Sequence, residues 1–318
     1  MYLFRDWWLN ILNKTKKQHY VPQFLLKKFA IKSGRKAQVW VMDKELNNFF
    51  ISPTKDIAHE NKFYDGFNEN HNIPHMEDLL KKVDGTGANS INKILINKNL
   101  QLSDDEKYNL ALFIAVQIVR TSSLQKEFAA MREYIVQHYG SDIQFGGDKK
   151  KVSEYSKEDD KQAALNCIVL FAQEFAEHLL TRRWFLCESP QNRNFILSDN
   201  PVVRDNMFDQ RPYGNLGLLS PGIEIYLPLS PRSCLYIICP QLAQVVISGS
   251  LVESPLRDSF LTGLPIFMNN ENVMRVNSLQ VVFSERFIFS KSKSDFDIAI
   301  EMISKNPKLK KGLRAKIN

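Results

Sequence analysis

The stretch from 110 to 119 would form a helix that is apolar on every face, with Gln117 as its one polar member. Such a helix has to be covered by other elements on all sides, so it predicts a core helix within a sizeable globular body. Ser103, followed three residues later by Glu106, forms a capping-box pattern that would begin this helix, and Gly140 is expected to end it. A chain of 318 residues has room for one large domain or two modest ones.

Turn signals and hydrophobic periodicity predict the remaining elements. Further helices are expected from Pro22 to Gly34, from about Ile73 onward with interruptions at Gly85 and Gly87, and from Ser156 to about Arg182. Residues 38–43 and 48–52 alternate around a short turn, which predicts a β-hairpin. Later strands are expected at 184–187, 194–197, 223–227, 234–239, 245–247, 279–283 and 287–289.

The order of these elements predicts an α+β fold. An N-terminal helical part with a β-hairpin would pack against a C-terminal, mostly antiparallel sheet as one large domain. The domain is expected to span 17–291, with its helical half ending near 182 and its sheet half covering 183–291. An aromatic extension at 1–16 would precede it, and a C-terminal helix and basic tail at 292–318 would follow it.

The aromatic extension contains Trp7 and Trp8 but lacks the cleavage site of a secretion signal. Its rings would lie on a membrane surface, or dock on the protein's own core or on a partner subunit, and docking on protein is the favoured interpretation. No stretch reaches the roughly 20 apolar residues of a spanning helix, so no transmembrane segment is expected. Four widely spaced cysteines favour a reduced, cytoplasmic protein without a structural zinc site.

Positive charge is concentrated in two short patches. The net charge is +7, yet residues 14–36 contain eight Lys/Arg and residues 305–318 contain six, with no acid in either, so the rest sums to −7. Each patch would either contact the phosphates of a nucleic acid or form a solvated face and a frayed tail. The sequence therefore makes nucleic acid an expected partner through residues 14–36, which include Lys14, Lys16, Lys17, Lys27 and Lys28.

Gln117 and Arg120 lie three residues apart on the predicted core helix and hence on one face. A buried guanidinium is costly unless a carboxylate or several carbonyls meet it, and Asp199, in Ser198-Asp-Asn-Pro201, is the expected partner. Two interpretations remain open. The pair belongs to a functional site at a strand end, or it is a structural ion pair with Asp199 capping its own loop.

His19 precedes the helix expected at Pro22, where the helix dipole lowers the pKa of an imidazole and favours a neutral general base. The alternative is a histidine that simply binds a backbone carbonyl. Glu174 and His178 share a helix face but lack the second histidine of a zinc-protease pair, so no metal site is expected.

These landmarks together resemble a known prokaryotic family, a domain of unknown function (four-two-three-eight) with an H-Y-V-P-Q-F signature. The landmarks are His19-Tyr-Val-Pro-Gln-Phe, Val39-Trp-Val, Phe63-Tyr64, Gln117-Ile-Val-Arg-Thr121, Arg183-Trp184, Ser198-Asp-Asn-Pro201 and Pro228-Leu-Ser-Pro231. The resemblance covers roughly 17–291. It implies that His19, Gln23, Gln117, Arg120, Asp199 and Asn200 occupy the family's characteristic polar positions, and it supplies no reaction or cofactor.

Three hypotheses follow. The first is a hydrolase acting on nucleic acid, with RNA as the favoured substrate. Its acid or base would be His19, Arg120 would stabilise phosphate charge and Asp199 would orient either one, while Gln23, Gln117, Asn200, Lys27 and Lys28 would bind substrate. The second hypothesis is a non-enzymatic ligand-binding module whose polar cluster is structural. The third is a partner-dependent effector, for example in phage defence, that docks through Trp7 and Trp8.

Overall fold

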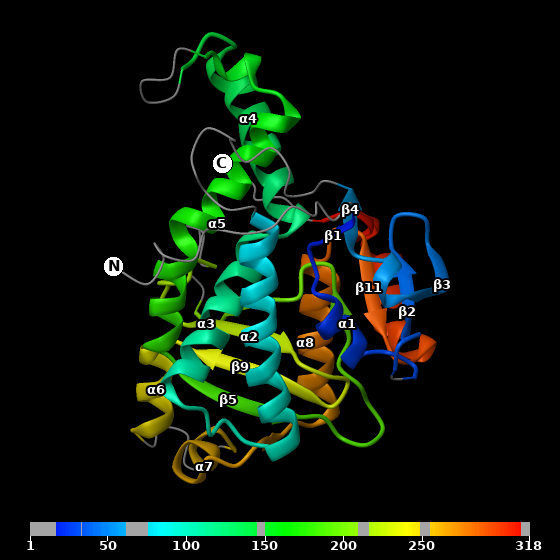
Figure 1. The fold of residues 1–318 in the computed structure, drawn as a ribbon, viewed down its shortest axis with the longest axis vertical. Helices are drawn as coiled ribbons and strands as arrows, with labels where there is room; N and C mark the ends of the chain where they lie inside the picture. Colours follow the sequence, from blue (N-terminus) through cyan, green and yellow to red (C-terminus); the bar gives the residue numbers. More distant parts are fainter. Residues whose placement is uncertain are drawn as a thin grey trace.

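The computed structural model describes residues 17–32, 34–61, 76–144, 150–208, 216–248 and 255–312, and it shows a mixed α+β body (Figure 1). The aromatic extension with Trp7 and Trp8 lies outside these residues, as do Lys14, Lys16, Phe63-Tyr64 and the end of the basic tail from 313.

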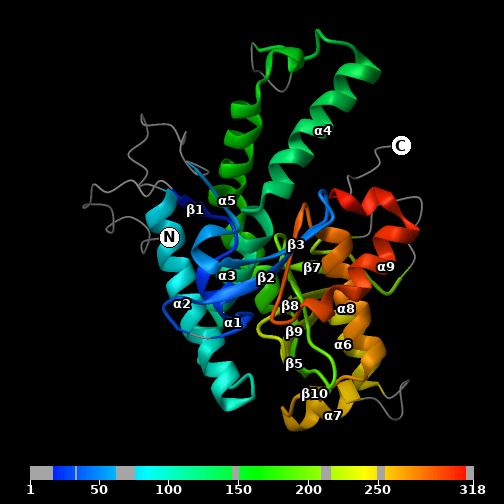
Figure 2. The ribbon, with the colours of Figure 1, turned by 90° about the vertical axis from the view of Figure 1, so that its right-hand side faces the viewer.

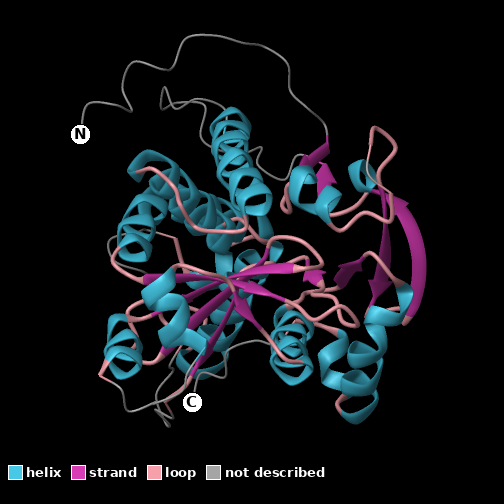
Figure 3. Cartoon of the chain, turned by 90° about the horizontal axis from the view of Figure 1, so that it is seen from below, coloured by secondary structure: helices cyan, strands magenta, loops and turns pink. Residues whose placement is uncertain are grey.

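The larger sheet has five strands in the order β10-β5-β9-β8-β7. These strands are β5 (Arg183–Glu188), β7 (Val203–Asn206), β8 (Ile223–Pro228), β9 (Ser233–Ile238) and β10 (Ile266–Phe267). Every neighbouring pair is antiparallel except β10 with β5, so the expected antiparallel character is confirmed. Strands β8 and β9 are buried along their whole length, because helices cover both faces of the sheet (Figure 3).

A second, four-stranded antiparallel sheet joins the two ends of the chain. Its order is β3-β2-β11-β6, with β2 (Gln38–Asp43), β3 (Asn48–Pro53), β6 (Leu197–Ser198) and β11 (Phe287–Ser290). The predicted hairpin, β2–β3, therefore pairs with strands from the C-terminal half, in a sheet separate from the five-stranded one. A short pair, β1 (Lys17–His19) with β4 (His59–Asn61), lies beside it.

The helical layer has α3 (Asp104–Val119) at its centre, with α2 (Met76–Asn97) and α5 (Lys157–Leu180) packed on it (Figure 1). The predicted capping box is present, since Ser103 Oγ accepts from Glu106 N and Glu106 Oε2 accepts from Ser103 N. The expected interruptions at Gly85 and Gly87 are wrong, because α2 passes through both. A Cβ at position 87 would lie 2.6 Å from Cγ of Phe113, so glycine there permits the close approach of α2 to α3.

The helix predicted to run from Ser103 to Gly140 is two helices. It ends at Val119, and Thr121 then takes an extended conformation as N-cap of α4 (Ser122–Tyr139). Neither glycine nor proline marks this break, and a β-branched N-cap is a weak local signal. Gly140 ends α4 as expected, with φ of 97°.

Two predicted strands are helical. Residues 245–247 belong to α6 (Pro240–Ile247) and residues 279–283 to α8 (Asn270–Phe283), because short apolar runs suit a buried strand and a buried helix equally. Of the strand predicted at 194–197, only the end, in β6, is extended. The remaining helices are α1 (Gln23–Lys28), α7 (Pro255–Thr262) and α9 (Asp297–Lys305), the last being the predicted C-terminal helix.

Helix α4 and part of α5 extend away from the sheets (Figures 1 and 2). Ser122, at the start of α4, is the one residue of this helix that is buried. By length and composition alone α5 has what a membrane-spanning helix needs, which the sequence analysis did not anticipate. It begins with an acidic turn and packs along α3 and α4, and a third of its apolar window is buried.

Candidate functional site

Gln117 and Arg120 connect α3 to the H-Y-V-P-Q-F segment. The Gln117 side-chain amide donates to the Tyr20 carbonyl at 2.9 Å, and its Oε1 accepts from Nε and Nη2 of Arg120 at 2.8 and 2.5 Å. The Gln117 amide nitrogen therefore holds the backbone before α1 against α3, and its amide oxygen fixes the Arg120 guanidinium.

Arg120 is 2% exposed and lies with its Nη1 2.8 Å from Oδ1 of Asp84 in α2. The predicted burial and pairing are confirmed, but the predicted partner, Asp199, is wrong. Asp84 fills that role because α2 packs directly on α3. Burial raises the pKa of Asp84, and the guanidinium of Arg120 opposes this rise. The three side chains Asp84, Gln117 and Arg120 are called the α2–α3 cluster below.

Asp199 fixes the loop that follows α8. Its Oδ1 accepts from the backbone N–H of Glu285 at 2.7 Å, and its Oδ2 accepts from those of Arg286 and Phe287 at 2.7 and 2.8 Å. Burial raises the pKa of Asp199 to about 6, while the three amides and the charge of Lys44 act in the opposite direction. A carboxylate with both oxygens bound to backbone serves first to position this loop.

Lys44 is a buried cation in the turn between β2 and β3. It has no exposed surface, and its Nζ donates to the carbonyls of Val281 and Ser284 at 2.9 and 2.8 Å. The ammonium thereby satisfies carbonyls at the end of α8. Burial lowers the pKa of Lys44 to about 8, although Asp199 and Glu285 raise it.

The other predicted polar residues are dispersed. His19 lies in β1, opposite His59 of β4, with ring centroids 5.2 Å apart. Gln23 is the half-buried first residue of α1. Asn200 donates from its side chain to the Phe283 carbonyl at 3.2 Å, which again closes the end of α8.

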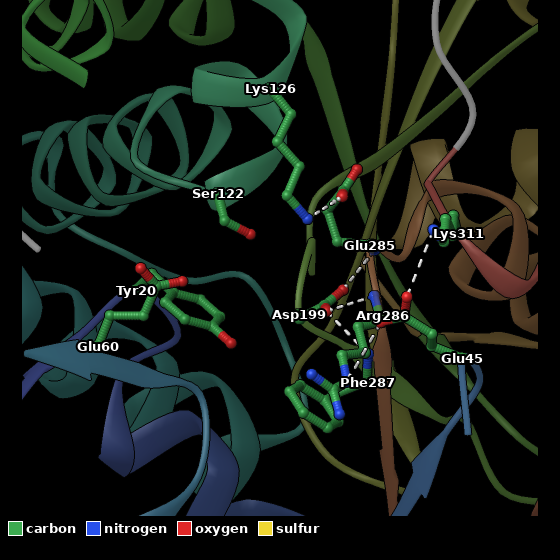
Figure 4. A pocket seen from close by; sticks show the side chains of 10 residues that line it. All are labelled: Tyr20, Glu45, Glu60, Ser122, Lys126, Asp199, Glu285, Arg286, Phe287 and Lys311. Atoms are coloured by element: carbon green, nitrogen blue, oxygen red, sulfur yellow. Dashed lines mark hydrogen bonds and ion pairs between the residues drawn. The ribbon is translucent and has the colours of Figure 1, made fainter. Parts of the chain in front are cut away.

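One polar pocket is lined by residues of two landmarks, Tyr20 and Asp199, and by Ser122, which follows a third (Figure 4). It has a volume of about 380 Å³, and we call it the motif pocket. Figure 4 shows side chains from the H-Y-V-P-Q-F segment, β4 and α4 on one side, and side chains from the Asp199 region and the loop after α8 on the other. Its lining residues are Tyr20, Glu45, Glu60, Ser122, Lys126, Asp199, Glu285, Arg286, Phe287 and Lys311. Neither His19 nor Arg120 is among them.

Most charges of the motif pocket are paired. Lys126 Nζ lies 2.6 Å from Oε2 of the buried Glu285, and Lys311 Nζ lies 3.4 Å from Oε1 of Glu45. Arg286 is held at 2.6 Å by Asp43, just outside the pocket. Among the described residues, no group of His, Cys, Asp and Glu side chains is arranged to hold a metal ion.

A second hollow, of about 590 Å³, is lined by cations, and none of its described lining residues is acidic. We call it the basic groove. Its cations come from the last turn of α1 and the residues after it, from the residue after α2, from the turn before β9 and from the residue after β11. They are Lys27, Lys28, Lys32, Lys98, Arg232 and Lys291.

The groove cations differ in how far they are engaged. Lys98 pairs with Glu188 at 3.1 Å, Lys28 donates to Oδ1 of Asn92 at 2.5 Å, and Arg232 donates to the Ser189 carbonyl at 2.7 Å. Burial also lowers the pKa of Lys28. The other three lysines, at 27, 32 and 291, form no ion pair with any residue that the structure describes.

The two hollows lie at opposite ends of β11. Phe287, its first residue, lines the motif pocket, and Lys291, just after its last residue, lines the basic groove. At about 3.3 Å per residue these two positions are roughly 13 Å apart. The predicted site residues therefore separate, with the substrate-binding candidates Lys27 and Lys28 in the groove and the catalytic candidate Asp199 in the motif pocket.

Several lining residues were missed by the sequence analysis. Ser122 and Lys126 directly follow the Gln117-Ile-Val-Arg-Thr121 landmark, and Arg232 directly follows Pro228-Leu-Ser-Pro231, so proximity to a landmark is a usable signal for these three. Glu60, Lys98, Glu285 and Lys291 carry no such signal.

The chain belongs to the family described as a protein of unknown function (DUF4238), whose model matches residues 17–294. The resemblance given by the sequence landmarks is thereby confirmed. Searches of curated proteins and of solved structures return no match.

Proposed function

We propose that this protein binds nucleic acid through the basic groove. The observation that carries the proposal is the convergence of six cationic side chains from four separate segments on one hollow that contains no acidic side chain. Such a concentration of positive charge is the electrostatic footprint of phosphate binding. The N-terminal basic patch of the sequence contributes three of the six, Lys27, Lys28 and Lys32.

The groove favours contact with the phosphate backbone over reading of bases. Its apolar lining consists of Ala30, Ile31, Leu95 and Pro231, with no aromatic ring on which a base would stack. Binding through phosphates alone depends weakly on sequence and strongly on salt.

The proposal is for binding without hydrolysis. Gln117 binds Arg120 and a backbone carbonyl, and Asp199 binds backbone amides. These contacts support a structural role for the three residues. The groove itself is lined by no His, Asp or Glu that would act as a general acid or base. A binding module, one of the two non-enzymatic alternatives raised by the sequence, is therefore the interpretation that the geometry favours.

Fluorescence anisotropy with labelled duplex DNA and RNA tests this proposal. The variant combines Lys27→Gln, Lys32→Gln and Lys291→Gln, the three lysines without an ion pair. Each phosphate contact contributes about −0.9 to the slope of log affinity against log salt on duplex DNA, so the slope should become flatter by up to about 2.7. The matched control neutralises three exposed lysines elsewhere, with Lys305, Lys308 and Lys310 changed to Gln, and should leave the slope nearly unchanged.

Three results would contradict the proposal. They are wild-type binding that ignores salt, an equal effect of the two triple variants, and cleavage of labelled RNA or DNA by purified protein. Cleavage that is lost in His19→Ala protein of normal melting temperature would restore the hydrolase hypothesis.

A further inference from the structure

The motif pocket contains the uncapped beginning of α4. The N-cap residue Thr121 makes no side-chain hydrogen bond to the first turn, and that turn contains no acidic residue. The backbone N–H groups at the start of this 18-residue helix therefore lack the side-chain acceptor that usually satisfies them, at the positive end of the helix dipole.

Ser122 adds a hydroxyl that has no hydrogen-bond partner among the residues that the structure describes. It is the first residue of α4, is 9% exposed, and makes no side-chain hydrogen bond with any described residue. Figure 4 shows this hydroxyl pointing into the motif pocket, with Lys126 one helical turn further along the same face. The residue is nine-tenths buried and its hydroxyl faces the pocket, so the hydroxyl is free to donate to a ligand atom bound there.

Glu60 adds an unpaired carboxylate to the same pocket. It forms no ion pair within 4 Å in the described part of the chain, although Lys126 and Lys161 act on it from a distance. The Glu60 side chain is exposed to solvent at the mouth of the pocket, and the protein around it raises its pKa.

The other charged groups of the pocket are already paired, unlike the start of α4 and Glu60. Lys126 with Glu285, Lys311 with Glu45 and Arg286 with Asp43 are neutralised within the protein. Both oxygens of Asp199 are bound to backbone amides. Among the described residues, the pocket thus offers N–H groups without a side-chain cap at the start of α4, and a solvent-exposed carboxylate without an ion pair at Glu60.

We infer that the motif pocket is a binding site for a small zwitterion of the α-amino-acid type. The ligand carboxylate accepts from Ser122 and the first N–H groups of α4, and its ammonium group donates to Glu60. A volume of about 380 Å³ lies within the range of small-molecule sites. Tyr20 and Phe287 supply aromatic surface for the ligand's side chain. This inference is independent of nucleic-acid binding, because the basic groove lies at the other end of β11.

Thermal-shift measurements with the full chain, followed by titration calorimetry, test the inference. The probes are the standard amino acids, each at millimolar concentration, together with acetate, methylamine and inorganic phosphate. At least one amino acid should bind and raise the melting temperature. Acetate, methylamine and phosphate, which each carry charge of one sign only, should bind much more weakly. Ser122→Ala and Glu60→Gln should each weaken binding by about ten-fold or more, since each removes a hydrogen bond to a charged ligand group.

The controls use neighbours that do not line the pocket. Ser123→Ala is the adjacent hydroxyl, and Glu133→Gln is an exposed carboxylate on the same helix, so both should bind the amino acid like the wild type. The inference is overturned if no amino acid binds, if acetate, methylamine or phosphate binds as tightly as the best amino acid, or if the pocket variants and the controls bind equally.

Discussion

Replacing Arg120 by alanine should destabilise the protein substantially, because the change leaves Asp84 without its cation and Gln117 without its donors. Removing one partner of a fully buried pair costs about 3–5 kcal/mol. The Arg120 side chain has no exposed surface, but the Asp84 side chain is 25% exposed and so retains some water. We therefore expect a loss near the lower end of that range, about 3 kcal/mol, in the free energy of unfolding measured by urea denaturation.

The pH dependence of this loss distinguishes an ion pair from simple packing. Without Arg120, the pKa of the buried Asp84 rises further above its unfolded value, so the folded state binds more protons than the unfolded state. The stability of the variant relative to wild type should therefore improve as the pH falls from about 7 to about 5. The control Lys81→Ala removes an exposed cation that pairs with Glu77 and Asp78 on the surface of α2, and it should cost at most about 1 kcal/mol. A loss below about 1 kcal/mol for Arg120→Ala, independent of pH, would refute the reasoning.

Two further predictions concern Gly87 in α2 and the buried Lys44. Gly87→Ala should destabilise by about 1–3 kcal/mol, because its Cβ would meet Phe113, whereas Gly85→Ala has open space and should stabilise by about 0.5–1 kcal/mol in the same urea titration. Equal effects of the two changes would contradict the close approach of α2 and α3. The pKa of Lys44 is lowered to about 8, so above that pH the folded state releases a proton that the unfolded state keeps up to its ordinary value of about 10.4. Stability relative to Lys44→Met protein should therefore rise between these two pH values, and a flat difference would show that this lysine is not desolvated.

Residues whose hydrogen-bond partners lie close in the sequence could be predicted from the sequence. The capping box of Ser103 and Glu106 is closed within four residues, and the β2–β3 hairpin pairs residues on either side of one turn. The core position of α3 also follows from its own composition, since an apolar helix is stable only when covered. These features required no knowledge of what lies across the core.

The partners of buried charges were decided by the tertiary structure. Arg120 needed a counter-charge by sequence alone, but the choice of Asp84 over Asp199 depended on α2 packing beside α3. The Asp199 carboxylate accepts from the backbone amides of residues 285–287, which lie far from it in the sequence. Apolar runs such as 279–283 became helical because caps and packing partners, rather than their own periodicity, select between a buried helix and a buried strand.

The two candidate sites, the motif pocket and the basic groove, were also decided almost wholly by the tertiary structure. The sequence established that residues 14–36 are basic and that Lys27 and Lys28 sit on one short helix. It contained no sign that Lys98, Arg232 and Lys291 would converge on them, because like charges brought together in a groove gain nothing locally and are held there by the fold. The motif pocket likewise required β4, α4 and the loop after α8 to meet. Local propensity determines elements from within a few residues, whereas a cavity exists only once packing has set the separation of elements distant in sequence.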